Sequence, residues 1–283
     1  MYTVLAKRRS HMTKGCLFFD IDGTLVDSTQ TAEVHEEVLE AIRTAQSRGY
    51  ACLICSGRSL PGLAQYRDIG MDGFVFSDGA GILLEGHEMI LNPIPADLVK
   101  QLIRQAEEYG AELFMSSIEK SFASGKQYAM MKEWEEILSK DGVPADLGIR
   151  RVEEHTDEPI LESDICFSSP AEEEIWLKVK DPGMEYINTT ASYGRDGGTS
   201  GELTKLGITK GSGAIMAAEL LGCDMKNTYA FGDSMNDASM LKECAVGIAM
   251  GNSAQELKDL ADYVTDDINE HGIVNAMKHF GII

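Results

Sequence analysis

The sequence predicts an α/β fold, in which a doubly wound, mostly parallel sheet carries an inserted α+β cap domain. Two observations support this. Short apolar runs alternate with segments of helical spacing at both ends of the 283-residue chain, as strands and crossover helices do around a parallel sheet. Between these ends, strands and helices are expected in a different order, which indicates a separate domain.

The first half of the sheet is predicted from residues 15–84. Residues 16–21 are an apolar run that ends in acidic residues and glycine, as a buried strand followed by a loop does. Residues 31–48 carry apolar side chains at helical spacing, and Gly49 follows as a stop. Further strands are predicted at 50–55 and 74–76, and a helix at 59–69. The α/β rhythm breaks after Gly79, and a hairpin predicted at 80–84 and 89–91 begins the differently ordered middle part.

The middle of the chain, residues 85–194, is assigned to the cap. Helices are predicted at 95–109, 127–139 and 171–179, and strands at 111–116, 120–123, 160–168 and 184–192. The glycine-containing stretch 193–200 is expected to be a loop.

The α/β rhythm resumes in residues 195–283, which complete the core domain. Helices are predicted at 210–221, 235–242, 254–261 and 272–279, strands at 228–231 and 245–249, and a short edge segment at 262–264. Residues 1–14 have no apolar stretch and are set aside as a tail of native or artificial origin.

The charged residues of the chain limit the kinds of molecule that the protein is expected to bind. The net charge is −21, from 25 Lys and Arg against 46 Asp and Glu, so nucleic acid and anionic membranes are not expected to bind. A phosphorylated metabolite would need local cations or a metal in its site. The six cysteines lie mostly in apolar stretches, and we read them as reduced core thiols in a cytoplasmic protein.

Acidic residues follow two of the predicted strands. Asp20 and Asp22 come directly after the first strand, and their spacing returns both side chains to one side of an extended chain. Asp233 and Asp237 follow the strand at 228–231. Ligands bind beyond the carboxyl ends of strands in such sheets, and close carboxylates need a cation such as Mg²⁺. Taken singly, each loop is also explained by helix capping.

A phosphate site is suggested by two further segments. Ser56, Gly57 and Arg58 follow the second strand and offer a hydroxyl, a backbone N–H and a guanidinium. Ser56 could instead be a simple helix cap. Lys210 begins a predicted helix, where its charge opposes the helix dipole and hints at an anionic partner, although Lys205 competes for this role.

Together these motifs resemble those of the haloacid dehalogenase-like (HAD) superfamily. Asp20–Leu25 (DIDGTL) resembles its first motif, Ser56 the second, Lys210 the third and Gly232–Asp237 (GDSMND) the fourth. Only the stretch between Ser56 and Lys210 is long enough for a cap, which is typical of the Cof-type phosphatases. These often have Asn-Gly-Ala where this chain has Ser77-Asp78-Gly79-Ala80.

The resemblance implies a Mg²⁺-dependent phosphatase that acts on small phosphorylated metabolites through an aspartyl phosphate. Asp20 would be the nucleophile and Asp22 the general acid/base, and Arg58 would contact the substrate. The implied phosphate-binding residues are Ser56, Gly57, Lys210 and Asn236. The implied metal ligands are Asp20, Asp22 through its backbone carbonyl, and Asp233, with Asp237 in support.

Two other functions stay open at this stage. A phosphosugar mutase of the same superfamily would pass the phosphoryl group to a second hydroxyl instead of to water. A non-catalytic protein that binds a phosphorylated ligand is the alternative from another class. The particular substrate and the oligomeric state are not predicted.

Overall fold

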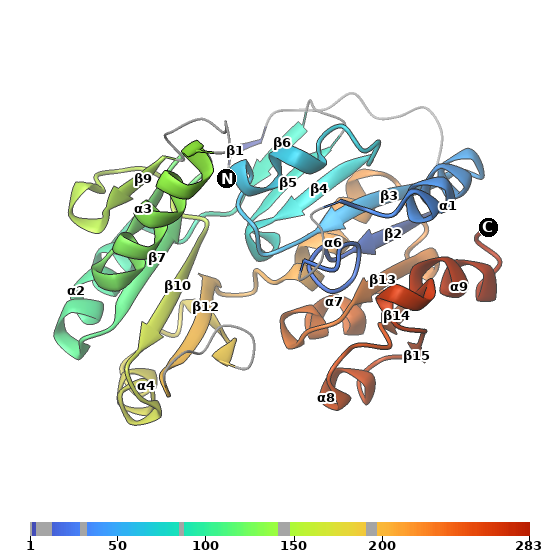
Figure 1. Cartoon of the computed structure of the whole chain (residues 1–283). Helices are drawn as coiled ribbons and strands as arrows, with labels where there is room; N and C mark the ends of the chain where they lie inside the picture. The colour runs from blue at the N-terminus through green and yellow to red at the C-terminus, as the bar shows by residue number, and fades with distance from the viewer. Residues whose placement is uncertain (1, 4–12, 29–32, 85–87, 141–147, 191–196) are drawn as a thin grey trace. The chain divides into compact units, whose positions relative to one another are not determined.

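The computed structural model describes residues 2–3, 13–28, 33–84, 88–140, 148–190 and 197–283. The chain divides into two compact units. The core unit contains residues 1–58, 62–91 and 208–283, and the inserted unit contains residues 59–61 and 92–207. Each unit is built around its own sheet (Figure 1).

The core unit contains a nine-stranded sheet in the order β1-β6-β5-β4-β3-β2-β13-β14-β15. Its parallel part runs from β4 to β15. These strands are β2 (Gly15–Phe19), β3 (Tyr50–Cys55), β4 (Gly73–Phe76), β13 (Thr228–Gly232), β14 (Val246–Ala249) and β15 (Tyr263–Val264). The antiparallel edge is formed by β5 (Gly81–Leu84), β6 (Glu88–Leu91) and β1 (Tyr2–Thr3).

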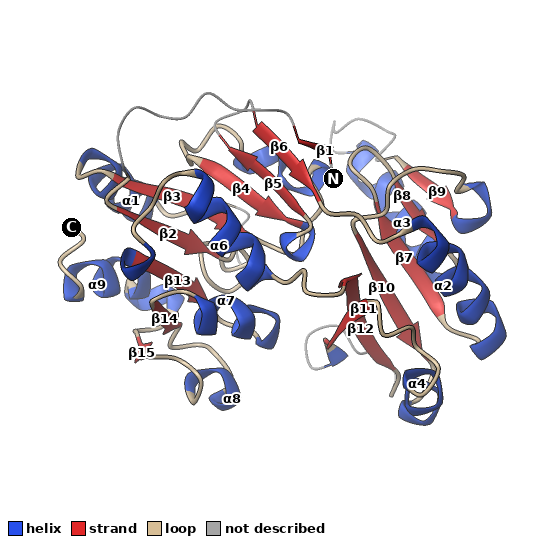
Figure 2. Cartoon of the chain, turned by 180° about the vertical axis from the view of Figure 1, so that it is seen from behind, coloured by secondary structure: helices blue, strands red, loops and turns tan. Residues whose placement is uncertain are grey.

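Helices cover both faces of this sheet (Figures 1 and 2). On one face, α6 (Lys210–Leu220) and α7 (Ala238–Glu243) share a buried cluster with Phe18 and Leu53. On the other face, α1 (Glu36–Ser47) packs on β3 and against α9 (Gly272–His279). Because β2, β3 and β13 are covered on both sides, every one of their residues is buried, which explains their unbroken apolar runs.

Short helical turns complete the core unit. They are η1 (Pro61–Tyr66), which begins in the inserted unit, then η2 (Ser77–Gly79), η4 (Met225–Asn227), η5 (Met235–Asp237), α8 (Gln255–Lys258) and η6 (Ile268–Glu270). Of these turns, η2 directly follows β4, and η5 follows β13 after Asp233 and Ser234.

The inserted unit contains a six-stranded sheet in the order β11-β12-β10-β7-β8-β9. The strands are β7 (Glu112–Ser116), β8 (Ser121–Ala123), β9 (Ile149–Arg151), β10 (Glu162–Phe167), β11 (Met184–Asn188) and β12 (Thr199–Lys205). The helices are α2 (Ala96–Tyr109), α3 (Gly125–Lys140), α4 (Pro170–Leu177) and the turn η3 (Val152–Glu154). Trp176, from α4, is fully buried with Leu102, Ile165 and Leu203 in the core of this unit.

The boundaries of the compact units differ from the predicted domain boundaries. The core unit continues to Leu91 instead of ending at residue 84, because β5 and β6 extend the core sheet. It resumes at Ile208 instead of residue 195, because β12 pairs with β10 and β11 of the inserted unit. The sequence analysis missed β12 because its polar residues hide the alternation of a strand.

Three other predicted segments differ in the structure. The predicted helix 59–69 is only the turn η1, since Pro61 and Gly62 disfavour a longer helix. The predicted helix 31–48 begins at Glu36, and residues 29–32 lie outside the described part. The segment 1–14 is not merely a tail, because Tyr2 and Thr3 form β1 and the buried Thr13 donates a hydrogen bond to the Leu221 carbonyl.

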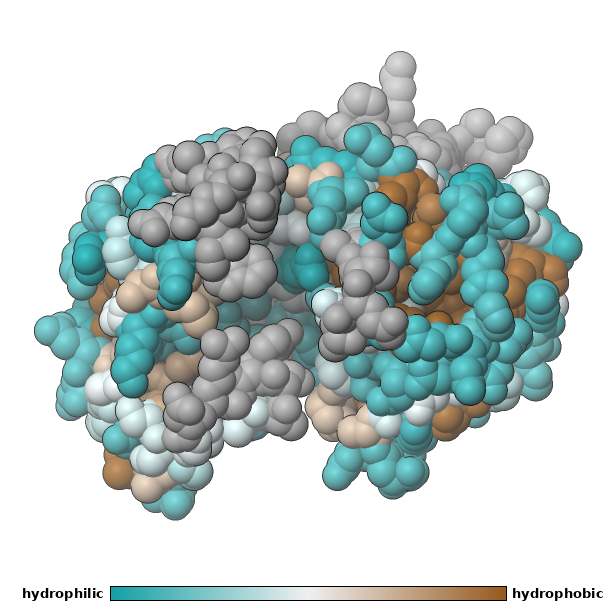
Figure 3. Space-filling model, viewed as in Figure 1, coloured by the Kyte–Doolittle hydropathy of each residue, from teal (hydrophilic) through white to brown (hydrophobic). Residues whose placement is uncertain are grey.

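The surface matches the composition of the chain. Hydrophilic residues predominate on the face drawn in Figure 3, as the net charge of −21 requires. In the parts of the chain that the structure describes, no helix combines the length and apolarity needed to cross a membrane.

Candidate active site

Neighbouring strands place two acidic loops side by side. β2 and β13 pair in parallel with Phe19 opposite Phe231, so their carboxyl ends lie at the same edge of the sheet. Asp20 immediately follows β2, and its backbone N–H donates to the Phe231 carbonyl (3.0 Å). Asp233 immediately follows β13. The parallel pairing therefore brings together carboxylates that are far apart in the sequence.

Gly23 allows the first loop to pass close to Asp233. Its φ is +86°, in the left-handed region, and a Cβ atom there would lie 2.3 Å from Asp233 Oδ2. The next residue, Thr24, donates its hydroxyl to Asp233 Oδ1 (3.2 Å). The glycine of the first motif is thus needed both for its backbone conformation and for the space it leaves.

Lys210 joins the two acidic loops from a third element. Its Nζ donates to Asp20 Oδ1 (2.9 Å) and to Asp237 Oδ1 (2.7 Å). It begins α6 after the cap residue Thr209, whose hydroxyl accepts from the Ser212 N–H. Lys205, the competing lysine of the sequence analysis, is exposed at the end of β12 in the inserted unit.

Both carboxylate oxygens of Asp237 accept hydrogen bonds from the protein. While Oδ1 accepts from Lys210, Oδ2 accepts from the backbone N–H groups of Asp233 (3.0 Å) and Ser234 (3.1 Å). The side chain therefore braces the loop that carries Asp233. This geometry favours a supporting role for Asp237, with Asp20 and Asp233 offering oxygens to a metal.

The carboxylates of the acidic cluster outnumber the lysine that they surround. Asp20, Lys210 and Asp237 are 6%, 1% and 0% exposed. Burial, followed by repulsion from Asp237, raises the pKa of Asp20 well above its ordinary value, against the pull of Lys210. Burial and Asp237 also raise the pKa of Asp233 to about 7. Burial opposes the charge of Lys210, but Asp20 and Asp237 raise its pKa overall.

A hard divalent cation fits this cluster. Oxygen atoms of Asp20, Asp233 and Asp237 lie within 4.8 Å of one another. Three carboxylates face one lysine, and carboxylate oxygens are the ligands that Mg²⁺ prefers. A divalent cation would supply the positive charge that the raised pKa values of Asp20 and Asp233 show to be lacking.

The second motif forms a small polar loop at the end of β3. Ser56 is 3% exposed, and its Oγ accepts from the Arg58 backbone N–H (3.2 Å). A Cβ atom on Gly57 would lie 3.2 Å from Asp78 Oδ1, so Gly57 leaves room for a neighbouring carboxylate. Cys55, the last residue of β3, contacts the Lys210 carbonyl through its thiol (3.6 Å), which places this loop beside the lysine.

Asp78 is a residue of the site that the sequence analysis missed. Its side chain is buried and its charge acts on Lys210. Ser77 and Asp78 both have positive φ values, +47° and +48°, which is a strained conformation for residues other than glycine. The sequence could have pointed to Asp78, because Ser77-Asp78-Gly79 stands where the Cof-type phosphatases often have Asn-Gly.

Arg58 binds the predicted acid/base residue. Its Nε donates to Asp22 Oδ2 (2.9 Å) and its Nη2 to Asp22 Oδ1 (2.7 Å), so both carboxylate oxygens are engaged. The guanidinium also lies over the Tyr66 ring, 5.7 Å from its centroid. Sequence reasoning named Arg58 and Asp22 but not their pairing, nor Tyr66.

Asn236 is connected to the site through its own loop. It lies in η5, and its Oδ1 accepts from the Ser234 hydroxyl (2.5 Å). A role for Asn236 in phosphate binding stays a prediction that follows from the resemblance.

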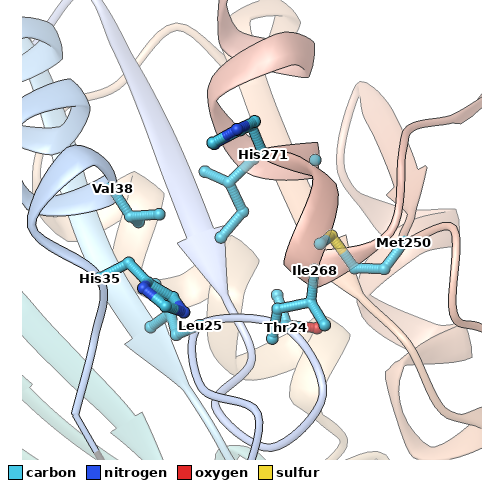
Figure 4. Close-up of a pocket in the computed structure, with 9 residues that line it drawn as sticks. Thr24, Leu25, His35, Val38, Met250, Ile268 and His271 are labelled. Atoms are coloured by element: carbon cyan, nitrogen blue, oxygen red, sulfur yellow. The ribbon is translucent and has the colours of Figure 1, made fainter.

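A small pocket lies behind the first motif (Figure 4). Thr24 and Leu25 line it from the loop after β2, His35 and Val38 from the start of α1, and Ile268 from η6. The lining of this pocket does not include Asp20, Asp233 or Asp237. Thr24 connects the pocket to the site, because it lines the pocket and donates a hydrogen bond to Asp233.

Comparison with known proteins places this geometry in a family. The model of the haloacid dehalogenase-like hydrolase family matches residues 17–277. The solved structure of the HAD subclass IIB sugar phosphatase BT4131 is similar, with a TM-score of 0.77 and 30% identity, covering 95% of this chain and 100% of that one.

Two proteins of Bacillus subtilis strain 168 are similar over nearly their whole length. YkrA is 28% identical over 96% of this chain and 100% of its own. The 5-amino-6-(5-phospho-D-ribitylamino)uracil phosphatase YcsE is 25% identical over 92% of this chain and 93% of its own. From the family match, the fold and the cluster of Asp20, Lys210 and Asp233, we conclude that the chain belongs to the haloacid dehalogenase-like hydrolases, as a phosphatase of the Cof type.

Proposed function

We propose that this phosphatase is Mg²⁺-dependent and hydrolyses small phosphomonoesters, such as sugar phosphates, through an aspartyl phosphate on Asp20. The observation that carries the proposal is the buried contact of Lys210 with Asp20 and Asp237, with Asp233 alongside. A buried lysine between carboxylates, at the edge of a parallel sheet, is an arrangement that can receive a phosphoryl group and a cation together.

In the first step, a carboxylate oxygen of Asp20 would attack phosphorus. The bond from phosphorus to the ester oxygen breaks, and that oxygen takes a proton from Asp22. In the second step, Asp22 takes a proton from water, which attacks the phosphorus and releases Asp20 and inorganic phosphate. Lys210, Ser56, Asn236 and the Gly57 N–H would hold the phosphoryl oxygens during both steps.

The metal would be held by Asp20, Asp233 and the backbone carbonyl of Asp22, with Asp237 bracing the loop. When bound, Mg²⁺ supplies positive charge to the phosphoryl oxygens and offsets the repulsion between substrate and carboxylates. Six free cysteines support the proposal of a reducing, cytoplasmic location. Small phosphorylated metabolites are the proposed substrates because two of the similar proteins are a sugar phosphatase and a phosphatase of a ribitylaminouracil ester.

Replacing the nucleophile tests the proposal. We expect Asp20→Asn to lower kcat for p-nitrophenyl phosphate with Mg²⁺ by at least about 10⁴-fold, the scale of losing a nucleophile. The fold should persist, because the asparagine side-chain oxygen can still accept the hydrogen bond from Lys210. Asp68→Asn, at an exposed position, is the matched control and should keep full activity. Turnover by Asp20→Asn at the wild-type rate would refute the assignment.

A further inference from the structure

The pairing of Arg58 with Asp22 poses a conflict for the proposed reaction. As the general acid, Asp22 must donate a proton to the ester oxygen of the leaving group. In the structure, both of its carboxylate oxygens accept hydrogen bonds from the Arg58 guanidinium. The two-pronged contact covers one edge of the carboxylate, so a leaving group can take its proton at this edge only after Arg58 has released Asp22.

Arg58 is an accessible cation of the described part of the site. Lys210 is buried and already contacts two carboxylates, whereas the Arg58 side chain is 33% exposed and its partner Asp22 39% exposed. Of the five N–H donors of the guanidinium, the contacts with Asp22 use one on Nε and one on Nη2. The exposed part of the guanidinium can meet an anion that enters from solvent.

We propose that Arg58 selects phosphomonoesters whose leaving group carries a second anionic group, such as a carboxylate. That group takes the place of Asp22 on the guanidinium and frees Asp22 to protonate the ester oxygen. This inference rests on the proposed function. Among the small phosphomonoesters proposed there, it favours phosphorylated sugar acids over neutral sugar phosphates at the same site. The chain's net charge of −21 adds to the argument, because an anionic leaving group needs a local cation to be accepted.

A neutral leaving group offers no such exchange. Freeing Asp22 would then break two charge-assisted hydrogen bonds with no protein or substrate group to replace them. An anionic leaving group exchanges one carboxylate for another on the same guanidinium, at little net cost. Tyr66 favours this exchange, because its ring lies 5.7 Å from the guanidinium and can hold Arg58 in place while its anionic partner changes.

Two substrates with the same carbon skeleton test the proposal. 3-Phosphoglycerate carries a carboxylate where glycerol 3-phosphate carries a neutral hydroxymethyl group. We expect the wild-type protein with Mg²⁺ to prefer 3-phosphoglycerate by about tenfold in kcat/KM, which corresponds to about 1.4 kcal/mol. In Arg58→Gln this ratio should fall to about one, because the glutamine neither attracts the carboxylate nor holds Asp22.

The ratio of kcat/KM for the two esters separates selection of the leaving group by Arg58 from a merely structural role. A variant that is only less stable or less well ordered loses activity on both esters and keeps the ratio. Arg67→Gln, which removes another exposed arginine next to Tyr66 in sequence, is the matched control and should keep the wild-type ratio. Melting curves by circular dichroism establish that Arg58→Gln is folded.

Two results overturn the proposal. One is a wild-type protein that shows no preference for the carboxylate ester, and the other is an Arg58→Gln variant with the wild-type ratio. Neither result contradicts the proposed function if the wild-type protein hydrolyses p-nitrophenyl phosphate. If the wild-type protein with Mg²⁺ releases phosphate from none of these esters, the proposed function itself fails.

Discussion

Lys210 is the residue that determines the electrostatics of the site. It is 1% exposed, and its two carboxylate contacts come from loops after different strands. A buried charge of this kind is tolerated only when it is paired. Burial, together with repulsion from Asp237, raises the pKa values of Asp20 and Asp233 even though Lys210 lies among them.

This charge balance predicts how stability depends on pH when metal is absent. The pKa of Asp233 is raised from 3.8 to about 7, so between these values the folded state binds more protons than the unfolded state. The free energy of unfolding should therefore fall as pH rises from about 4 to about 7. Melting temperatures in EDTA measure this dependence.

Asp233→Asn isolates the contribution of this carboxyl group. The variant has no proton to lose, so its melting temperature should decline less than that of the wild-type protein over the same pH range. Equal declines in both proteins would contradict the assignment of the shift to Asp233.

At the scale of elements, three strand ends and one helix start create the site. The parallel pairing of β2 with β3 and β13 fixes where Asp20, Ser56 and Asp233 begin their loops, and the start of α6 supplies Lys210. The loop after β2 is the tightest of these connections, because Gly23 passes directly beside the Asp233 carboxylate.

Gly23→Ala should therefore damage the site more than backbone strain alone would. A left-handed alanine costs about 1–2 kcal/mol, and here its Cβ would also lie 2.3 Å from Asp233 Oδ2. Gly70→Ala is the matched control, because Gly70 has a φ of +89° with nothing within 4 Å. We expect Gly23→Ala alone to lose Mg²⁺-dependent activity, and to lose more stability in urea unfolding. Similar losses in both variants would show that the close approach is unimportant.

At the scale of the whole molecule, the proposed metal site links distant parts of the sequence. Asp20 belongs to the first segment of the core unit and Asp233 to the last, and the inserted unit separates these segments in sequence. A ligand that joins the two segments only in the folded state stabilises that state.

Mg²⁺ should therefore raise the melting temperature, and EDTA should reverse the rise. At a free concentration about 100 times the dissociation constant, the stabilisation would be about 2.7 kcal/mol. Asp233→Asn should remove most of this shift, while Asp68→Asn, at an exposed position, should keep it. A shift of the same size in all three proteins would point to a different metal site.

Much of the core unit and its site could be predicted from local patterns. The runs at 16–21, 50–55 and 228–231 are β2, β3 and β13, because strands covered on both faces are apolar throughout. The rule that ligands bind at the carboxyl ends of strands then pointed to Asp20, Asp233 and, with the resemblance, Lys210. Prediction failed at β12, where polar side chains on a buried strand give no clear period.

The sequence by itself determined which chemical groups are present and in what order, because strand periodicity and motif spacing are local properties of the chain. Only the tertiary structure decided which of these groups touch. The pairing of Arg58 with Asp22, the burial of Asp78 near Lys210 and the contact of Asp237 with Lys210 all join segments that no local pattern connects. Contacts of this kind depend on strand order and on the space that neighbouring residues leave, which are fixed only when the whole chain packs.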